Sequence, residues 1–552
     1  MDIINFFLFL LSTNLDCIFM KIKTLLFTVC FSILSVWVYG QETELVGANC
    51  TSIMVGRNAS ADGSVITSHT CDSKYRTWVT MEPAADHKAG EMHKVYKGTM
   101  HTETPRSMEG MTLAGEIPEA AHTYAYMNTA YPCLNEKQLA IGESTFSGPD
   151  TLTNEKGMFL IEELERIVLQ RCDNARDAIK LMGELVAQYG YGDGGECLTI
   201  ADKKEVWQFE ILGEGPDKIG GIWVAQRVPD DHVAVSCNVA RIGKIDRKNK
   251  DFFMASDNIE KVAKKYGLWD GQGDFVWWKA FPSSYSGNKN FKEREWYIFN
   301  ELAPSMHLSL DADELPFSIK PDEKVDVRKV MELFRANYEG SPELDQTQNL
   351  LYPRKRKVDG QIVTDTVVCP NANPWMDGNE RAMFNMLKPG AVTFYRGVAM
   401  SWCSYSFITQ CRDWLPDEIG ALCWFSLENP GQSPRIPIYA GMTKMPAGFD
   451  ICGHFRFNEN AALWHYRKAN KLGQVKWGLT KQMFYNNIKR YEDKAFNELP
   501  ALEKQVVEIL NAGKKEEAQQ MLNQYSSDFA GATRQTWREM ECKMWEQFWT
   551  GF

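Results

Sequence analysis

The sequence predicts an α+β fold in which sheets stack on each other and are covered by helices. Strand-like runs follow residue 49, two amphipathic helical segments come next, and strand-like runs return after residue 195. The tail from about residue 459 is helical in pattern. Separate blocks of strands and helices, in place of a regular βα alternation, are typical of this class.

The chain starts with a segment that is typical of a secretory signal. Residues 20–23 (Met-Lys-Ile-Lys) form a short basic stretch, residues 25–38 are apolar, and Gly40 is a small residue suited to signal-peptidase cleavage. The apolar run is short and no stop-transfer pattern follows, so we interpret it as a removable leader and not as a membrane anchor.

The leader sets the first boundaries of the chain. An earlier apolar stretch, residues 3–11, lacks a basic start, which favours Met20 as the true first residue. We therefore predict an upstream segment and signal peptide over residues 1–40 and a short propeptide over residues 41–49. Cys50 would then be the first residue of the mature protein.

Export to the periplasm or the extracellular space is the expected location. The alternative is a lipoprotein, with lipid on Cys50, which would be associated with a surface. Residues 46–49 (Val-Gly-Ala-Asn) make a poor lipobox, because Asn49 stands directly before the cysteine.

Composition excludes several classes of function. Charged residues make up 24% and apolar residues 44% of the chain, as in soluble globular proteins. The net charge of −11 and the lack of a basic run argue against a nucleic-acid partner.

Of fourteen cysteines, Cys17 and Cys30 lie in the leader, and the other twelve show no disulfide framework. No CxxC or HExxH motif occurs, so the sequence supports no metal site.

The first predicted strands lie directly after the leader. Residues 50–57 are expected to form a strand, Asp62-Gly63 a turn, and residues 64–69 a second strand that runs towards Asp72. Residues 73–122 are polar and irregular, and we expect loops around a site.

A strand pair and two helices follow. Residues 124–131 and 138–144 are expected to pair across a turn at residues 134–137. The first helix has one apolar face, and the second keeps helical spacing over residues 175–189, with Asn174 and Asp177 as its capping pair. The glycine-rich run that ends the second helix is not interpreted as a phosphate loop, since such a loop should follow a strand.

The rest of the chain returns to strands and ends in helices. The strands predicted for this part cover residues 196–201, 206–212, 222–228, 232–240, 392–400, 405–411 and 420–427. Residues 245–390 are less regular, with a helix at residues 327–338. An apolar stripe at helical spacing near the C-terminus indicates core packing by Trp537, Met540, Met544, Trp545 and Phe548.

Cys50 combines two reactive groups if the leader is cut before it. Its thiolate is a strong nucleophile, although a free thiol with a pKa of about 8.5 is mostly protonated at neutral pH. A free α-amine has a pKa of about 7.7–8.0 and is suited to act as the base for that thiol. A lone cysteine in an apolar strand is more often a core residue. Its position after a cleavable leader favours the catalytic interpretation.

Six segments are distinctive: CTSIMVGR at 50–57, ADGS at 61–64, Asp72-Ser73, NEKQLAIGEST at 135–145, AVSCN at 234–238 and SPRIPIYAG at 433–441. In sequence and in order they resemble segments of the dipeptidases of peptidase family C69. These dipeptidases are N-terminal-nucleophile hydrolases, related more distantly to penicillin V acylases and conjugated bile acid hydrolases.

The resemblance implies a four-layer αββα sandwich over residues 50–455, with a helical C-terminal extension over residues 456–552 packed on it. It also implies cleavage of short peptides, chiefly dipeptides with a free amino end, and no need for a metal or cofactor. A homo-oligomer is left open, and no membrane insertion is expected after leader removal.

The resemblance also implies the site residues. Cys50 matches the nucleophile and, through its amine, the base, and Asp72 matches the residue that orients this amine. Asn238 matches the donor to the oxyanion. The other half of the oxyanion site would be formed, through backbone N–H groups, by Glu143, Ser144 and Thr145.

One position departs from the family. Many relatives have Arg-Asn where this chain has His69-Thr70. A histidine is charged only near or below pH 6.5, whereas arginine is always charged. Either His69 does a reduced version of the same work, or the site is weakened and binds peptides without cleaving them. The sequence thus predicts an exported cysteine dipeptidase, with an amidase for non-peptide acyl amides or a weakened surface peptide-binding protein as alternatives.

Overall fold

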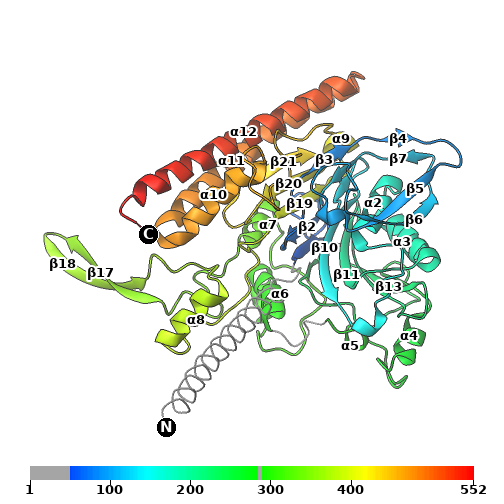
Figure 1. Cartoon of the computed structure of the whole chain (residues 1–552), viewed down its shortest axis with the longest axis horizontal. Coiled ribbons are helices and arrows are strands. Elements are labelled where there is room, and N and C mark those ends of the chain that lie inside the picture. The colour runs from blue at the N-terminus through cyan, green and yellow to red at the C-terminus, as the bar shows by residue number, and fades with distance from the viewer. Residues whose placement is uncertain (1–49, 284–288, 552) are drawn as a thin grey trace, which may run out of the picture. The chain divides into compact units, whose positions relative to one another are not determined.

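Two antiparallel sheets form the centre of the chain in a computed structural model, which describes residues 50–283 and 289–551 (Figure 1). They belong to a unit that runs from Asn49 to Phe552. In spatial order, the seven-stranded sheet consists of β16 (Ser318–Ile319), β14 (Val233–Ser236), β1 (Ser52–Val55), β2 (Val65–Cys71), β19 (Tyr405–Cys411), β20 (Ala421–Leu427) and β21 (Ile436–Tyr439).

The eight-stranded sheet carries most of the strands predicted between residues 124 and 228. Its spatial order is β15 (Phe253–Ala255), β13 (Gly221–Arg227), β12 (Val206–Gly213), β11 (Gly195–Ala201), β10 (Ala140–Ser147), β9 (Leu134–Asn135), β8 (Tyr126–Asn128) and β3 (Thr80–Glu82).

The two sheets pack against each other through β2, β10 and β11. Thr67 on β2 donates its hydroxyl to the carbonyl oxygen of Thr199 on β11 at 2.9 Å. A Cβ at Gly142 on β10 would lie 2.2 Å from the carbonyl oxygen of Ser68. This close approach explains why a glycine stands at that position, because no larger residue fits.

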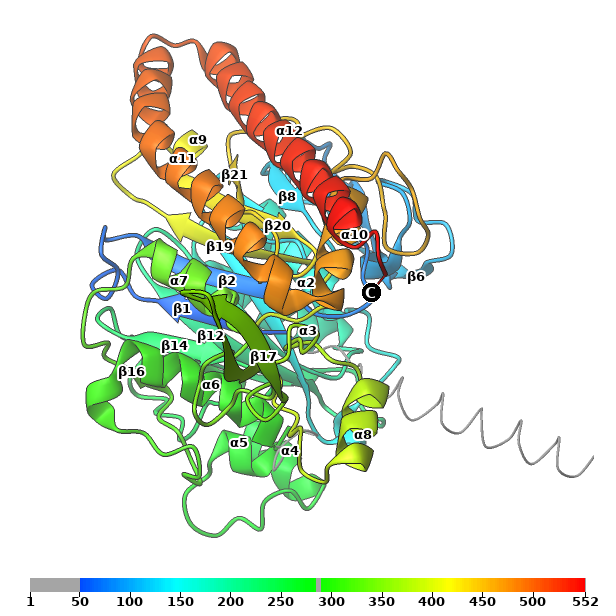
Figure 2. The ribbon, with the colours of Figure 1, turned by 90° about the vertical axis from the view of Figure 1, so that its left-hand side faces the viewer.

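Helices cover both sheets, as the α+β prediction requires. α2 (Ile161–Arg171) and α3 (Ala175–Tyr189) pack on the eight-stranded sheet. α6 (Lys289–Leu302), α7 (Val327–Phe334) and the C-terminal helices contact β14, β19, β20 and β21 of the other sheet. Helices therefore contact both sheets, and Figure 2 shows α7 beside β19. The predicted cap of α3 is also confirmed, since the Asn174 side chain accepts from the Asp177 N–H.

The tail that the sequence predicts to be helical consists of three helices in the described residues. They are α10 (Ala462–Val475), α11 (Trp477–Asn511) and α12 (Lys515–Gln547), and α12 contacts β21. Trp537 is fully buried and donates Nε1–H to the carbonyl oxygen of Gln432 at 3.0 Å. Met540, Met544 and Phe548 are buried as predicted, but Trp545 is 53% exposed. It directly follows Met544, so the helical turn of about 100° per residue carries it off the buried stripe.

Three strand and loop predictions are wrong. Residues 392–400 form no strand, although residues 398–400 are buried. Arg396 turns inward there and donates Nη1–H to the carbonyl oxygen of Gly397. Of the predicted turn residues 134–137, Glu136 and Lys137 form a turn, but Leu134 and Asn135 form strand β9, which lies between the two strands predicted to pair. Part of the predicted loop region 73–122 is a ribbon of β5 (Met92–Lys97) and β6 (Thr112–Pro118), whose pairing lies too far apart in the sequence to show as a hairpin.

The segment 245–390 holds more structure than its pattern predicts. β17 (Leu351–Val358) and β18 (Gln361–Val368) pair only with each other and project as a hairpin (Figure 1). The remaining elements of the described residues are β4 (Ala85–Asp86), β7 (His122–Thr123), α4 (Ile259–Lys265), α5 (Trp277–Ala280), α8 (Gly378–Leu387), α9 (Asp417–Gly420) and three short 3-10 turns.

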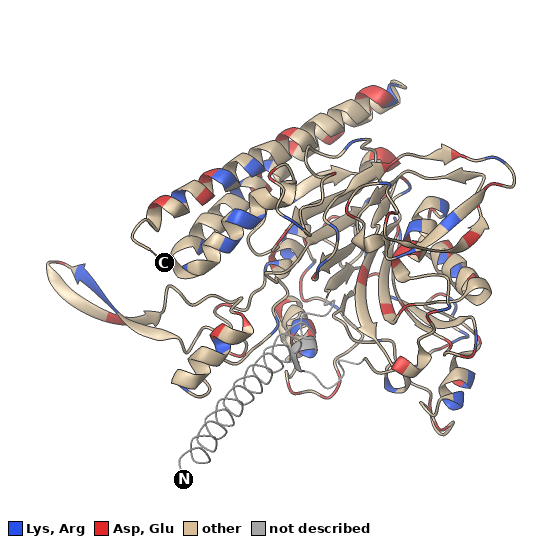
Figure 3. Ribbon diagram, viewed as in Figure 1, with Lys and Arg blue, Asp and Glu red and all other residues tan. Residues whose placement is uncertain are grey.

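Charges of both signs are interspersed along the outer helices α11 and α12 (Figure 3). Such mixed faces are typical of helices with one side in solvent. Among the described helices, none is both long and apolar enough to cross a membrane. The predicted signal peptide and propeptide lie outside the described residues.

Candidate active site

Cys50 lies just before the first residue of β1, Ser52. In the sheet, β1 is placed between β14 and β2. Ser52 pairs with Ser236 on β14. The Thr51 N–H donates to the Thr70 hydroxyl at 2.9 Å, and the Thr70 N–H donates to the Thr51 carbonyl oxygen at 2.9 Å. These reciprocal bonds place Cys50 beside the end of β2, where Asp72 follows.

The surroundings of Cys50 keep its thiol protonated. Its side chain is fully buried. Burial raises the pKa of the thiol well above its usual value, and the nearby charges of Glu143, Cys71 and Asp72 raise it further, whereas the Asp72 backbone N–H lowers it by a hydrogen bond. A protonated thiol needs a base before it can attack a carbonyl carbon.

Asp72 is fixed through one carboxylate oxygen. Oδ2 accepts from the Thr70 hydroxyl at 2.8 Å and from Arg396 Nη2 at 2.7 Å. Oδ1 is buried and has no hydrogen-bond partner among the described residues. This oxygen remains able to accept a hydrogen bond.

Asn238 follows β14 in the left-handed conformation, with φ 65°. Its backbone N–H donates to the Ser144 hydroxyl at 2.8 Å, and its Nδ2 donates to the Thr145 carbonyl oxygen at 2.6 Å. Asparagine tolerates this backbone conformation better than most residues, which suits it to turn sharply at the end of a strand. The structure thus brings Asn238 together with two of the predicted oxyanion residues.

Arg294 on α6 is a central residue that the sequence analysis missed. It is fully buried, and burial lowers its pKa to about 10, so it stays charged at neutral pH. Its guanidinium donates hydrogen bonds of 2.7–2.8 Å to Cys50 O, Thr51 Oγ1, Cys237 O and Asn238 Oδ1. The helical pattern of α6 was a usable signal for the helix, but nothing in it indicates which strands the arginine meets.

His69 lies inside an aromatic cluster. It stacks on Phe407, with ring centroids 5.5 Å apart. Nδ1 lies 2.7 Å from the Glu143 carbonyl oxygen and 3.1 Å from the Glu143 nitrogen. A carbonyl oxygen only accepts, so the shorter contact assigns the proton to Nδ1.

The expected charge state of His69 is wrong. We expected it to titrate near pH 6.5, but burial lowers its pKa to about 4, despite an opposing hydrogen bond with the Glu143 backbone. The imidazole is therefore neutral at neutral pH, because its cation would be removed from water without an adequate partner.

The Glu143 carboxyl lies beside the Cys50 thiol. Thr145 donates its hydroxyl to Oε1 at 3.0 Å. Burial raises the pKa of Glu143, while hydrogen bonds with Glu196, Cys50 and Thr145 lower it. The contacts described above thus link all seven predicted site residues around Cys50, although their roles do not follow from position alone.

Three of these side chains form a set that could hold a metal ion. One ligand atom each from Cys50, His69 and Glu143 lies within 4.8 Å of the others. Sulfur, imidazole nitrogen and carboxylate oxygen are ligands that Zn²⁺ accepts. The sequence supports no metal site because these residues have no motif spacing, and only the fold brings them together.

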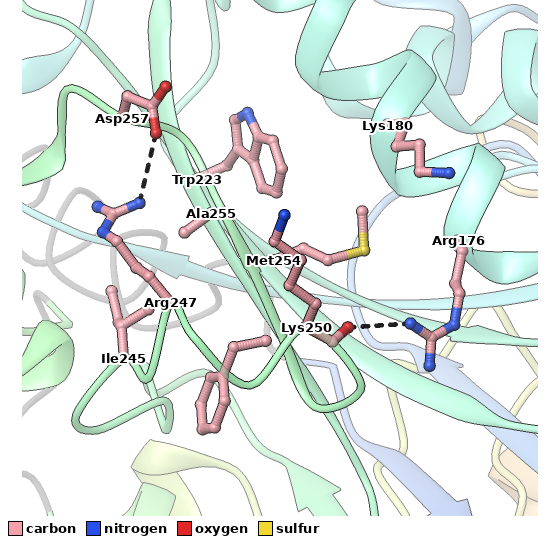
Figure 4. A pocket seen from close by; sticks show the side chains of 10 residues that line it. Arg176, Lys180, Trp223, Ile245, Arg247, Lys250, Met254, Ala255 and Asp257 are labelled. Atoms are coloured by element: carbon pink, nitrogen blue, oxygen red, sulfur yellow. Dashed lines mark hydrogen bonds and ion pairs between the residues drawn. The ribbon is translucent and has the colours of Figure 1, made fainter.

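A separate pocket of about 400 Å³ lies over β13 and β15 (Figure 4). None of the predicted site residues lines it. Arg176 is bonded there to the Lys250 carbonyl oxygen, and Arg247 is paired with Asp257 (Figure 4). This pocket is therefore distinct from the site around Cys50.

Comparison with known proteins defines the class of the chain. Residues 49–490 match the model described as peptidase family C69. The match covers most of the chain, which makes the chain a peptide hydrolase. It belongs to peptidase family C69.

Curated relatives are similar over most of their length. A "Probable dipeptidase" of Latilactobacillus sakei is 25% identical over 409 residues, which cover 71% of this chain and 74% of the relative. A "Probable dipeptidase" of Salmonella dublin is 25% identical over 424 residues, covering 73% and 83%. A "Probable dipeptidase B" of Streptococcus pyogenes serotype M1 is 22% identical over 450 residues, covering 78% and 79%.

Proposed function

We propose that the chain is an exported cysteine dipeptidase that cleaves short peptides with Cys50 as its N-terminal nucleophile. The observation that carries the proposal is the convergence of Asp72, Asn238 and Arg294 on Cys50. The dipeptidase names of the relatives support the substrate class. The contact between the two sheets and the helices on each of them support assignment to the αββα sandwich of N-terminal-nucleophile hydrolases, with residues 50–455 as the hydrolase domain and residues 456–552 as its extension.

The first chemical step is acylation of Cys50. Cleavage of the Asn49–Cys50 bond exposes an α-amine, which Asp72 Oδ1 orients. The amine takes the thiol proton as Sγ bonds to the carbonyl carbon of the substrate. The Asn238 amide donates to the oxyanion, and Arg294 holds the Oδ1 of this amide in place.

The second step releases the products. The protonated amine gives its proton to the leaving amine, and a thioester on Cys50 remains. Water then attacks the thioester, with the same amine as base, and the free acid departs from Sγ. The protein thereby needs no separate histidine base.

The test is production of the full chain in a host that exports it. Intact mass should place the first residue at Cys50, and dipeptides should be hydrolysed. A matched control is Cys542→Ala, which alters an exposed cysteine and should change neither result. A mature protein that still carries residues 41–49 and is fully active would overturn the proposal. Turnover of acyl amides without turnover of dipeptides would favour the amidase.

A further inference from the structure

Two buried carboxyl groups lie next to each other near Cys50. In the pairing of β10 with β11, Thr145 faces Glu196 and Glu143 faces Leu198. Glu143 and Glu196 are therefore diagonal neighbours on one face of the sheet. Glu143 is fully buried, Glu196 is 4% exposed, and their side chains are hydrogen-bonded to each other.

This pair has no basic partner among the described residues. The nearest is His69, with Nδ1 3.8 Å from Glu143 Oε2, and this imidazole is neutral. Oε2 of Glu143 and Oε2 of Glu196 are buried and have no hydrogen-bond partner within the described part of the chain. Buried carboxyls without a cation are costly, since burial and mutual repulsion both oppose their ionisation. A positively charged ligand would complement them.

The position of Glu143 suits the α-ammonium group of a peptide whose carbonyl carbon lies at Cys50. A carboxylate oxygen of Glu143 lies within 4.8 Å of Cys50 Sγ. In a peptide with a free amino end, the α-amine is about 2.5 Å from the first carbonyl carbon, by standard bond lengths. That carbon must approach Sγ to about 3–3.5 Å before attack. These separations allow the α-ammonium to approach Glu143 to hydrogen-bonding distance while the carbonyl carbon lies at Sγ.

We propose that Glu143 and Glu196 bind the α-ammonium group of the peptide, so that the scissile bond is the one that follows the first residue. The proposal rests on the proposed function of Cys50. Glu143 makes the direct contact, and Glu196 shares the negative charge and holds the Glu143 side chain against the thiol. The ligand class is peptides with an unmodified amino end, and acylated peptides are excluded because they carry no charge there.

The experiment compares L-alanyl-L-alanine with its N-acetyl derivative. Mature wild type should prefer the free dipeptide by at least about 10²-fold in kcat/KM, since each charge-assisted contact contributes strongly in a buried site. Glu143→Gln and Glu196→Gln should each reduce this preference by about 10–100-fold, mainly through KM of the free dipeptide. The matched control is Glu210→Gln, which alters another buried carboxyl of the same sheet and should keep the preference.

A binding measurement separates this proposal from catalysis. Cys50→Ala protein, made with residue 50 first by removal of a tag, should bind the free dipeptide but not the N-acetyl form in calorimetry. Glu196→Gln in that background should lose the difference. An unchanged preference in both glutamine variants, or equal binding of the two ligands, would overturn ammonium recognition. Binding without any hydrolysis by wild type would instead overturn the proposed function alone.

Discussion

The Cys50 side chain has surroundings that suppress its own reactivity before processing. Burial and the neighbouring carboxylates raise the pKa of the thiol, and in the unprocessed chain its nitrogen is a peptide nitrogen without basicity. Thiolate formation therefore depends on the α-amine that cleavage releases. In the proposed mechanism, reactivity of Cys50 is thereby coupled to cleavage of the Asn49–Cys50 bond.

We expect Cys50→Ala to abolish hydrolysis and leave the fold nearly unchanged, because a small buried residue replaces another small one. Steady-state assays on dipeptides and thermal unfolding measure the two effects. Cys50→Ser should keep a trace of activity, since the amine can still activate a hydroxyl. Undiminished turnover by Cys50→Ala would mean that the nucleophile is a different residue.

We expect Asn238→Ala to lower kcat by about 10²–10³, as for loss of one oxyanion donor. KM should change much less, because the interaction is strongest in the transition state. Full kinetic curves separate these parameters. An effect confined to KM would make Asn238 a ground-state binding residue.

His69 should affect stability at acid pH and not activity near neutrality. Its pKa is about 4 in the folded protein and about 6.5 when unfolded. The unfolded state therefore binds a proton first as pH falls. The contribution of the neutral His69 to the free energy of unfolding is fully present above pH 6.5. It is lost as the pH falls to 4, by about 3 kcal/mol in total.

The measurement is urea unfolding of wild type and His69→Gln at pH 7 and pH 4.5. The variant should lose less stability between the two pH values. The kcat/KM profiles of both proteins should have the same shape from pH 5.5 to 8. An acid limb near pH 6.5 in wild type alone would restore the charged-histidine hypothesis.

At the scale of elements, α6 and α12 contribute in different ways. α6 places Arg294 between the start of β1 and the end of β14, where it donates hydrogen bonds to Cys50 and Asn238. α12 instead covers the end of the seven-stranded sheet with apolar side chains. One helix thereby positions reacting groups, and the other supplies buried area.

Two tryptophans of α12 provide a matched test of this packing. Trp537→Ala should lower the free energy of unfolding by about 3–5 kcal/mol, because it leaves a cavity and an unpaired Gln432 carbonyl oxygen. Trp545→Ala should change it by less than about 0.5 kcal/mol, since this side chain is largely exposed. Equal losses in chemical unfolding would contradict the burial pattern.

At the scale of the whole molecule, the family match ends at residue 490, within α11. We expect a chain that stops at residue 490 to be insoluble, because α10 and β21 would lose their contacts with α12. Deletion of residues 351–368 should leave the protein folded, since hairpin β17–β18 pairs only with itself and is largely exposed. Soluble yield and thermal unfolding of both proteins decide between these outcomes.

Local pattern predicted much of this fold. Strands β1, β2, β11, β12, β13, β19 and β20 and helices α2, α3 and α10–α12 all follow from periodicity within short windows. The cap at Asn174 is equally local. The strand predicted at residues 392–400 failed because an apolar run can be buried without pairing, and its sequence does not distinguish the two.

The family could be identified, and Cys50 predicted as the candidate nucleophile, from the amino-acid order, because the matching segments consist of consecutive residues. Three sets of contacts could not be predicted from the amino-acid order: the hydrogen bonds of Arg294, the Asp72–Arg396 pair and the contact of Glu143 with Glu196. Each joins residues on different elements, and no local periodicity specifies such a contact. The low pKa of His69 has the same origin, since desolvation depends on the aromatic rings of Phe407 and its neighbours, which only folding brings around the imidazole.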